Sequence, residues 1–386
     1  MTYIGRCPDR LNLKDMLKYL VASDIHIGHK NTPTTHIVKN LIRYICTEDN
    51  KDLDVIFIAG DMFDRLLDLN TESVHGCLHF FNTIIRYCFN NNIKLRVLEG
   101  TPSHDWQQSR TLVKINDLKN NKCDLKYFTV LDIEYMEDLK LHVLYVPDEW
   151  ASDHSTLEKE IAAKLHEHNI TKVDIAILHG QFEYQVLGKP YKGFFFREDY
   201  FLNLVKGYIH VGHYHTHSVY DRIVAQGSFD RLVHGEEGDK GYVKVQLGDK
   251  ANFTFVVNHN AYIYKTIKIT TKTTLDSLDK AIHKLPTHSH VRLSMDVTSE
   301  FNHGFDELKV RYCDYNLKKL IKSEETEKTT TSHLLDTTDI AFSNLGYSNS
   351  NILDTVYDRL KNKHQLDDKQ MFKAKAYLEP YRATLV

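Results

Sequence analysis

The chain has 386 residues, a hydrophobic fraction of 42% and a formal net charge of −3 at neutral pH. At roughly 100–200 residues per domain, this length predicts two or three domains. The apolar content excludes a disordered chain. A negative net charge is not the basic footprint of a nucleic-acid-binding domain, so a polyanion would have to be held through cations or a partner.

The sequence contains no apolar run of the roughly 18 residues that are needed to span a membrane. Its first twenty residues include no apolar stretch typical of a signal peptide. The six cysteines are scattered and form no C-x-x-C pair. We therefore expect a cytoplasmic protein with reduced thiols, in the host cytoplasm if the source is viral.

Short apolar runs recur along residues 19–261, and they are typical of strands that are buried on both faces. In chain order these runs are Tyr19–Ala22, Val55–Ala59, Leu95–Leu98, Val173–Leu178 and Tyr208–Val211. Apolar residues at helical spacing predict helices between them, at His36–Cys46, Val74–Phe89 and Ser155–His168. Ser155 and Glu158 form the pattern of a capping box for the last helix. Strands that alternate with helices predict a layered α/β domain.

The composition changes near residue 262, because only Gly304 and Gly346 of the seventeen glycines lie beyond Gly248. A helix is predicted around Leu275–Leu285, and Val291–Val297 alternates as a strand with one solvated face does. The segment Ser323–Ser332 contains no apolar residue and is typical of a linker. We therefore expect a first domain over residues 1–261, a small domain over 262–322, a linker over 323–338 and a helical region over 339–386.

A polar cluster follows each of the five predicted strands. The clusters are Asp24-x-His26, Gly60-Asp61-x-x-Asp64, Ser103-His104-Asp105, His179-Gly180 and Gly212-His213-x-His215. Ligands of α/β sheets bind beyond the carboxyl ends of the strands, and residues two apart at a strand end point to the same side. Imidazole and carboxylate ligands together suit manganese, iron or zinc. Each motif alone is common by chance, but all five in order predict a metal site.

These five motifs, in this order across residues 24–215, resemble those of calcineurin-like metallophosphoesterases. The next segment is similar to one of SbcD-type nucleases, which process DNA double-strand breaks; it comprises Gly227-Ser228-Phe229-Asp230-Arg231, Gly235-Glu236-Glu237 and Lys240-Gly241. The similarity extends over residues 19–245. It implies a metallophosphoesterase β-sandwich flanked by helices, followed by a small α+β capping domain and a helical C-terminal tail.

The resemblance also implies two divalent metal ions, with manganese favoured over magnesium. The first ion would be held by Asp24, His26, Asp61 and His215, and the second by Asp61, His179, His213 and Ser103. His104 would lie beside the scissile phosphate and be oriented by Asp105, and Asp64 would fix a ligand from outside the site.

The third motif departs from the family pattern G-N-H-[DE], because Pro102 takes the position of the glycine and Ser103 that of the asparagine. A serine hydroxyl is shorter than an amide and is a weaker metal ligand. We therefore expect the second ion to be bound less tightly, to be held through water, or to recruit Thr101.

Hydrolysis of a phosphodiester explains why such a site needs two cations. The substrate is anionic, and two metal ions roughly 3.5–4 Å apart stabilise the attacking and leaving oxygens. Two dications carry more charge than Asp24 and Asp61 neutralise, so they attract a phosphodiester to an acidic chain. A protonated His104 can stabilise the transition state or protonate the leaving oxygen.

The implied function is that of a double-strand exonuclease and single-strand endonuclease in DNA repair, recombination or replication. The resemblance implies DNA, an SbcC-type ABC ATPase and a second copy of the chain as partners, with DNA positioned by residues 262–322 and the ATPase bound by 339–386. Trp106, His217 and Arg231 are candidate DNA contacts, because they lie near the motifs and Trp106 could stack on a base. The apolar stripe of Val74–Phe89 predicts either a dimer face or packing against the sheet.

Two other functions remain open at this point. A phosphatase or small-molecule phosphodiesterase of the same superfamily would use the same metal site. The serine at position 103 could instead mark a subunit that binds DNA ends but is catalytically weak.

Overall fold

The computed structural model describes residues 2–4, 16–68, 71–148, 153–186, 193–248 and 252–322. The predicted linker at 323–338 and the predicted helical region at 339–386 lie outside these described residues. Met1–Ile321 form one compact unit by their contacts.

The first sheet contains three of the predicted strands and has the order β1-β13-β12-β2-β3-β4-β5. Its parallel strands are β2 (Leu17–Ala22), β3 (Val55–Ala59), β4 (Lys94–Leu98) and β5 (Leu125–Phe128). Antiparallel strands extend it, namely β12 (Gly241–Leu247), β13 (Asn252–Val257) and β1 (Thr2–Ile4). Burial on both faces explains why the central strand β3 is apolar throughout, whereas β2 and β4 also contain lysine or arginine.

The second sheet has the order β10-β11-β9-β8-β7-β6. Its parallel strands are β7 (Leu141–Val146), β8 (Ile175–Gly180), β9 (Ile209–His213) and β11 (Ile223–Ala225). The antiparallel strands at its two edges are β6 (Asp132–Met136) and β10 (Ser218–Tyr220). The sequence indicated β8 and β9 but not β6 and β7, and the three-residue strands β10 and β11 carry too few residues for a clear pattern.

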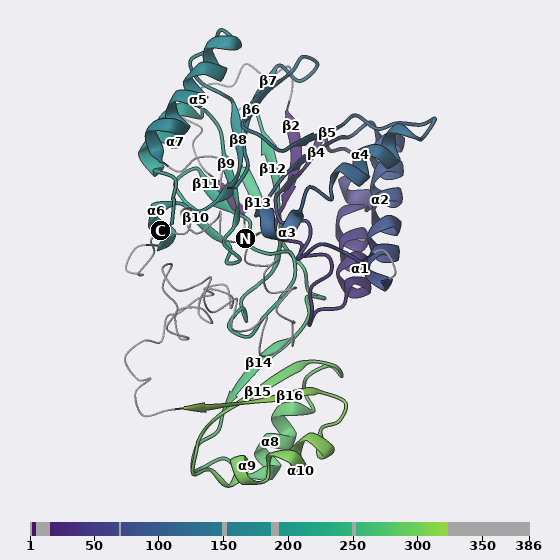
Figure 1. Cartoon of the computed structure of the whole chain (residues 1–386), viewed down its shortest axis with the longest axis vertical. Coiled ribbons are helices and arrows are strands. Elements are labelled where there is room, and N and C mark those ends of the chain that lie inside the picture. Colours follow the sequence, from purple (N-terminus) through teal and green to yellow (C-terminus); the bar gives the residue numbers. More distant parts are fainter. Residues whose placement is uncertain are drawn as a thin grey trace, which may run out of the picture. The chain divides into compact units, whose positions relative to one another are not determined.

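The two sheets face each other across a shared core, in which Tyr19 and Phe57 of the first sheet pack with Tyr145 and Ile177 of the second. Helices cover the outer faces (Figure 1). On the first sheet these are α1 (Thr34–Ile45), α2 (Glu72–Asn91) and α4 (Arg110–Asp117); on the second they are α5 (His154–Glu167) and α7 (Glu198–Leu204). The short helices are η1 (Glu48–Asn50), α3 (Pro102–Asp105) and α6 (Glu183–Val186). The predicted α/β class, with β-sheets flanked by helices, is confirmed.

The apolar stripe predicted on Val74–Phe89 is buried against the first sheet. Phe80, Phe81 and Ile85 are fully buried there, and they belong to the core between the helices and the sheet. This stripe therefore packs within the chain, and the opposite face of α2 points away from the sheet.

The N-terminus of α5 differs from the predicted capping box at Ser155. The N-cap is Asp153, whose carboxylate accepts a hydrogen bond of 2.9 Å from the backbone amide of Thr156. Aspartate is among the best N-cap residues because its side chain reaches the free amides of the first turn. The N-cap therefore lies two residues earlier than the capping-box pattern indicated.

The third sheet has the order β14-β15-β16 and packs its own small core. Its strands are β14 (Tyr264–Lys268), β15 (His290–Asp296) and β16 (Asn316–Lys322), and its helices are α8 (Leu275–Ile282), α9 (Glu300–His303) and α10 (Phe305–Arg311). Val291, Leu293 and Met295 of β15 are fully buried. Among all the described helices, none is long and apolar enough to cross a membrane.

Candidate metal centre

The loops after β2 and β3 are held together by backbone hydrogen bonds. The amide of Asp24 donates to the carbonyl of Gly60 (3.1 Å), and the amide of Ile25 donates to that of Asp61 (2.8 Å). In the second sheet, His179 at the end of β8 pairs with Gly212 near the end of β9. The carboxyl ends of parallel strands meet at one edge of a sheet. The four loops thus bring residues far apart in the sequence into one cluster.

Asp24, His26 and His215 form one group whose possible ligand atoms lie within 4.8 Å of one another. The Nε2 atoms of His26 and His215 are 3.1 Å apart. Nε2 of His215 lies 3.8 Å from Oδ1 of Asp24. The side chain of Asp24 is completely buried, and its Oδ1 also accepts a hydrogen bond of 2.8 Å from the amide of His213.

Asp61, His179 and His213 form a second group of the same size. Oδ1 of Asp61 lies 3.3 Å from Nε2 of His179. Asp61 is also in a third group, with His26 and His104, and its Oδ2 lies 3.7 Å from Nε2 of His26. The Asp61 carboxylate therefore reaches both halves of the cluster.

The partners of the outer ring nitrogens show which nitrogens can bind a cation. Nδ1 of His179 lies 2.8 Å from the carbonyl oxygen of Ala59, so it must carry the proton and donate it. Its Nε2 faces Asp61 and has no hydrogen-bond partner among the described residues; this buried atom can carry a proton or, when deprotonated, offer a lone pair to a cation. Nδ1 of His215 likewise faces Oε1 of Glu236 at 2.6 Å. Lone pairs that converge on carboxylates suit a divalent cation.

The backbone of this cluster is unusual at several candidate ligands. The φ angles of Asp24, His26 and Asp61 are 51°, 55° and 49°, and that of His213 is 95°. Positive φ is uncommon for residues other than glycine, and each case costs on the order of 1–3 kcal/mol. Such residues concentrate at functional sites, where the surrounding hydrogen bonds hold them in place.

Gly60 is required by the close approach of β3 to β8. Its φ is 83°, and a Cβ atom there would lie 2.1 Å from Nδ1 of His179. Any larger residue would displace the His179 ring or the loop that carries Asp61. Glycine tolerates both the positive φ and the close contact at this position.

A further set of charged side chains orients the candidate ligands from outside. Oδ1 of Asp64 lies 3.4 Å from Nδ1 of His26. Glu236, which faces His215, also lies 3.3 Å from the buried ammonium of Lys240. Lys240 donates to the carbonyl of His215 (2.7 Å) and to Oγ of Ser228 (2.8 Å). Such outer partners fix the tautomer and direction of a ligating imidazole.

The pKa values of the cluster reflect its opposite charges. Burial raises the pKa of Asp61, but the positive charge of His179 and the hydrogen bond from His104 hold it well below its usual range. Burial lowers the pKa of His179, yet the Asp61 carboxylate raises it well above its usual value. Burial likewise opposes protonation of His215, but Glu236 raises its pKa. The carboxylates thus stabilise positive charge on the imidazoles that they face, as they would stabilise a cation bound between them.

His104 lies at the mouth of the cluster. Its Nδ1 is 3.0 Å from Oδ2 of Asp61, and its side chain is 25% exposed. Asp105 was expected to orient His104, but both of its oxygens accept backbone hydrogen bonds, from Phe63 (2.9 Å) and Gly100 (2.7 Å). The buried Asp105 therefore joins the loop after β3 to the loop after β4 and places His104 through the backbone.

The hydroxyl group at the second cluster belongs to Thr101. Its Oγ1 lies 3.4 Å from Oδ2 of Asp61 and 3.4 Å from Nδ1 of His213, and its amide donates to Oδ1 of Asp61 (2.6 Å). Ser103 is exposed on α3, and its carbonyl accepts the indole N–H of Trp106 (2.7 Å). Of the two residues that the motif left open, Thr101 is the one beside Asp61.

The three candidate DNA contacts have other neighbours in the structure. Trp106 is 57% exposed and bonds back to α3. The ring of His217 is stacked on Phe255 at a centroid distance of 4.0 Å, and its Nδ1 lies 2.7 Å from the carbonyl oxygen of Ala225. Arg231 donates to the carbonyls of Gly238, Ala261 and Tyr262 at 3.2–3.4 Å. Of the three, Trp106 offers the most exposed surface for a nucleotide.

Sequence reasoning overlooked several residues around the cluster. Oδ2 of Asp148 lies 3.9 Å from Nδ1 of His213, just beyond the end of β7. A buried apolar run followed by an aspartate was the available signal, since the other clusters follow the same rule. Glu236 and Lys240 were part of a recognised segment, but the contact of Glu236 with His215 depends on the folding of the loop between them.

The buried His/Asp groups of the described residues could hold a metal ion. The mixture of imidazole and carboxylate ligands fits a divalent cation, and so do the side chains that hold the far nitrogens of the imidazoles.

Comparisons with known proteins add little to this picture. The chain matches no protein-family model and no curated protein. Thirty-four chains of solved structures match it. One of them, a crystal structure, is 13% identical over 60% of this chain and 95% of its own length, with a TM-score of 0.36. A similarity this weak supports no statement about function.

Proposed function

We propose that this chain is a metal-dependent DNA nuclease subunit of the SbcD type. It would hydrolyse phosphodiester bonds as a double-strand exonuclease and single-strand endonuclease in DNA end processing, recombination or repair. The observation that carries the proposal is the position of Asp61, whose carboxylate is shared by two groups of possible metal ligands beside His104.

Each side chain has a role in this proposal. Asp24, His26 and His215 would hold one ion, and His179 and His213 the other, with Asp61 between them and Thr101 close to the second. Two bound divalent cations, manganese or magnesium, would supply the charge that stabilises the attacking and leaving oxygens of the phosphodiester. Glu236 and Asp64 would keep the imidazoles of His215 and His26 in the orientation that binds.

His104 is suited to proton transfer at the scissile bond. Its Nδ1 lies 3.0 Å from Oδ2 of Asp61, and we assign proton transfer to the substrate to its other ring nitrogen, Nε2. An imidazole held in this way by a carboxylate can keep a proton and give it to a leaving oxygen. The partial exposure of His104, unlike the burial of His179, gives a substrate access to it.

The wider assembly is part of the same proposal. The third sheet with its helices would act as the capping domain that positions DNA. The chain would work as a homodimer with an SbcC-type ABC ATPase that binds the region after residue 338.

A nuclease assay tests the proposal. Purified chain, alone and coexpressed with the ATPase, is incubated with labelled linear duplex and with single-stranded DNA in the presence of manganese. We expect manganese-dependent degradation that is lost in His104→Gln and retained in the control His166→Gln, whose imidazole is exposed on α5. Absence of degradation in every condition contradicts the proposal. Turnover of phosphate monoesters or cyclic nucleotides without cleavage of DNA would instead identify a phosphatase or small-molecule phosphodiesterase.

A further inference from the structure

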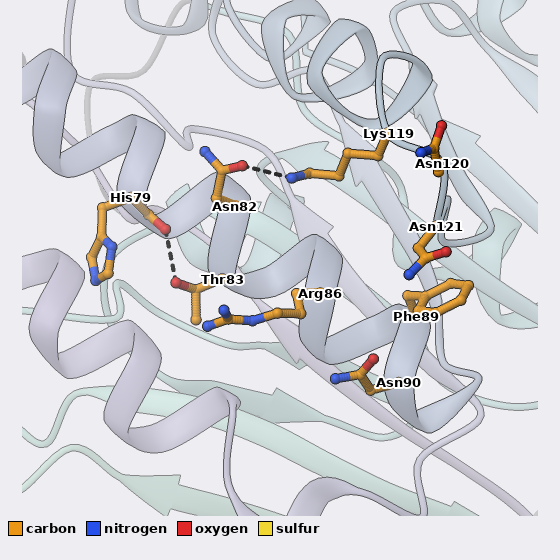
Figure 2. A pocket seen from close by; sticks show the side chains of 9 residues that line it. All are labelled: His79, Asn82, Thr83, Arg86, Phe89, Asn90, Lys119, Asn120 and Asn121. Atoms are coloured by element: carbon orange, nitrogen blue, oxygen red, sulfur yellow. Dashed lines mark hydrogen bonds between the residues drawn. The ribbon is translucent and has the colours of Figure 1, made fainter.

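A groove of about 560 Å³ lies between the outer face of α2 and the loop that follows α4 (Figure 2). Asn82, Arg86 and Asn90 line one wall, at intervals of four residues along the helix, and Lys119 and Asn121 come from the loop. Residues four apart lie on the same helix face, here opposite the stripe that packs on the sheet. No residue of the candidate metal centre lines the groove.

The two walls are held in place by hydrogen bonds. The ammonium of Lys119 donates to Oδ1 of Asn82 (2.7 Å), which joins the loop to α2 (Figure 2). The loop itself is closed by Asn116, whose amide side chain exchanges two hydrogen bonds with the backbone of Cys123 (3.0 and 3.1 Å). The groove is therefore formed before any ligand binds, which reduces the entropy cost of binding.

The groove is positively charged in a chain whose net charge is negative. Its lining includes Arg86 and Lys119 but no aspartate or glutamate. The acidic residues near the loop are engaged elsewhere, since Asp117 lies 4.0 Å from Lys122 and Asp124 lies 2.9 Å from Lys94. Within the described part of the chain, neither Arg86 nor Lys119 forms an ion pair with a carboxylate.

The other lining residues match the parts of a nucleotide. Phe89 is 41% exposed, so its ring is available for stacking with a base. The amide side chains of Asn90 and Asn121 offer both donors and acceptors, as the edges of bases require. Arginine and lysine supply the usual contacts to phosphate.

We propose that this groove binds a nucleotide unit, with its phosphate at Arg86 and Lys119 and its base against Phe89. A segment of single-stranded nucleic acid is the favoured source, because the groove is open and lacks a closed base pocket. A second copy of the chain fits less well, since a self-complementary interface would bring a patch with two cations and no acid against itself. The proposal does not rest on the nuclease function and concerns binding alone.

Fluorescence anisotropy of the full chain tests the proposal. The probe is a short labelled oligothymidylate, measured in a chelator so that neither cleavage nor metal-dependent binding contributes. The variants are Arg86→Gln/Lys119→Gln and Phe89→Ala. The control, Lys140→Gln/Lys159→Gln, removes the same charge from exposed lysines that lie outside the groove and outside residues 262–322. Thymidine monophosphate and inorganic phosphate serve as competitors that separate a strand from a free nucleotide or a simple anion.

We expect the charge variant to weaken binding by about tenfold or more and to make the negative slope of log K against log salt shallower by about 1.4. Phe89→Ala should weaken binding by about fivefold or more, because one stacking contact is lost. The control should bind like the native chain. Competition by the mononucleotide as effective as by the strand would identify a free nucleotide as the ligand and still support the site.

Three results would overturn the proposal. Equal binding by the native chain and both groove variants would place any nucleic acid elsewhere. Competition by inorganic phosphate together with no effect of Phe89→Ala would reduce the groove to an anion site without base recognition. A change in the molecular mass of the chain in the groove variants, with nucleic acid binding unaltered, would make the groove an interface between copies.

Discussion

Nε2 of His179 lies 3.3 Å from Oδ1 of Asp61, while the other ring nitrogen of His179 donates to the carbonyl of Ala59. Two acceptors at this distance repel each other unless a proton or a metal cation lies between them. The backbone has positive φ at Asp61 itself and at His213 on the neighbouring strand, and these conformations maintain the arrangement. The structure therefore places its unfavourable local features where a cation would offset them.

The contact between Thr101 and Asp61 predicts which hydroxyl supports the second group. Thr101→Ala should weaken manganese binding by about tenfold, because the hydroxyl next to Asp61 and His213 is removed. Ser103→Ala should bind manganese like the native chain, and Thr101→Ser should retain most of the affinity. Isothermal titration with manganese measures all three. Loss of affinity in Ser103→Ala but not in Thr101→Ala would restore the role that the motif assigned to Ser103.

Glu236 is expected to set the metal affinity through His215. Glu236→Leu should weaken manganese binding by about 10–100-fold, because the ring of His215 loses the partner that fixes its tautomer. Glu236→Gln keeps a neutral acceptor, so its manganese affinity should lie between those of Glu236→Leu and the native chain. The matched control is Glu237→Gln, whose side chain binds Lys265 on the protein surface. If Glu236→Leu and Glu237→Gln give the same affinity, Glu236 does not orient a ligand.

The close approach at Gly60 predicts a large effect of a single methyl group. Gly60→Ala should lower the free energy of unfolding by about 2 kcal/mol or more, because φ is positive and the new Cβ would overlap the His179 ring. Gly238→Ala is the control, since a Cβ there would meet no atom within 4 Å. Urea denaturation of both variants without metal measures the difference. A native-like midpoint for Gly60→Ala would contradict the geometry described for the loop.

The buried His210 should make the free energy of unfolding depend on pH. It is completely buried, where Tyr19 and Gln226 contact its ring nitrogens, and burial lowers its pKa to about 3. The unfolded chain binds a proton near the ordinary histidine pKa of about 6.5, so stability is lost as the pH falls below that value, down to about 3. Between about pH 7 and about pH 5 this residue should reduce the free energy of unfolding by about 2 kcal/mol.

The variant His210→Gln isolates this effect, because glutamine can hydrogen-bond but does not titrate in this range. Urea denaturation at both pH values should show a smaller loss of stability for His210→Gln than for the native chain. An equal loss in both proteins would show that His210 does not contribute to the acid sensitivity.

The general position of the site could be predicted from the sequence, because parallel strands place their carboxyl ends together. Asp24 after β2, Asp61 after β3 and His179 at the end of β8 were identified as polar residues at strand ends, and their roles as metal ligands came from the family resemblance. The α/β class was predicted from the same runs of apolar residues. These features depend on local sequence, which determines where a strand ends and which residues come directly after it.

The remaining features of the site depend on contacts between distant segments. The motif aligns Ser103 with a metal-ligating asparagine, but Ser103 is exposed on α3 and Thr101 lies beside Asp61. Asp105 follows a histidine in the sequence, yet its carboxylate binds backbone amides of two loops. The pairing of Glu236 with His215 spans a loop whose path no periodic pattern indicates.

The central claim is that Asp61 joins two cation sites, and manganese binding to the metal-free chain tests it most directly. Titration calorimetry of the native chain should give about two ions per chain, the number that a two-metal phosphodiesterase needs. Asp61→Asn should lose both high-affinity sites, while Asp276→Asn, an exposed control on α8, should keep them. A native chain that binds no manganese, or an Asp61→Asn variant that binds as much as the native chain, would contradict the account.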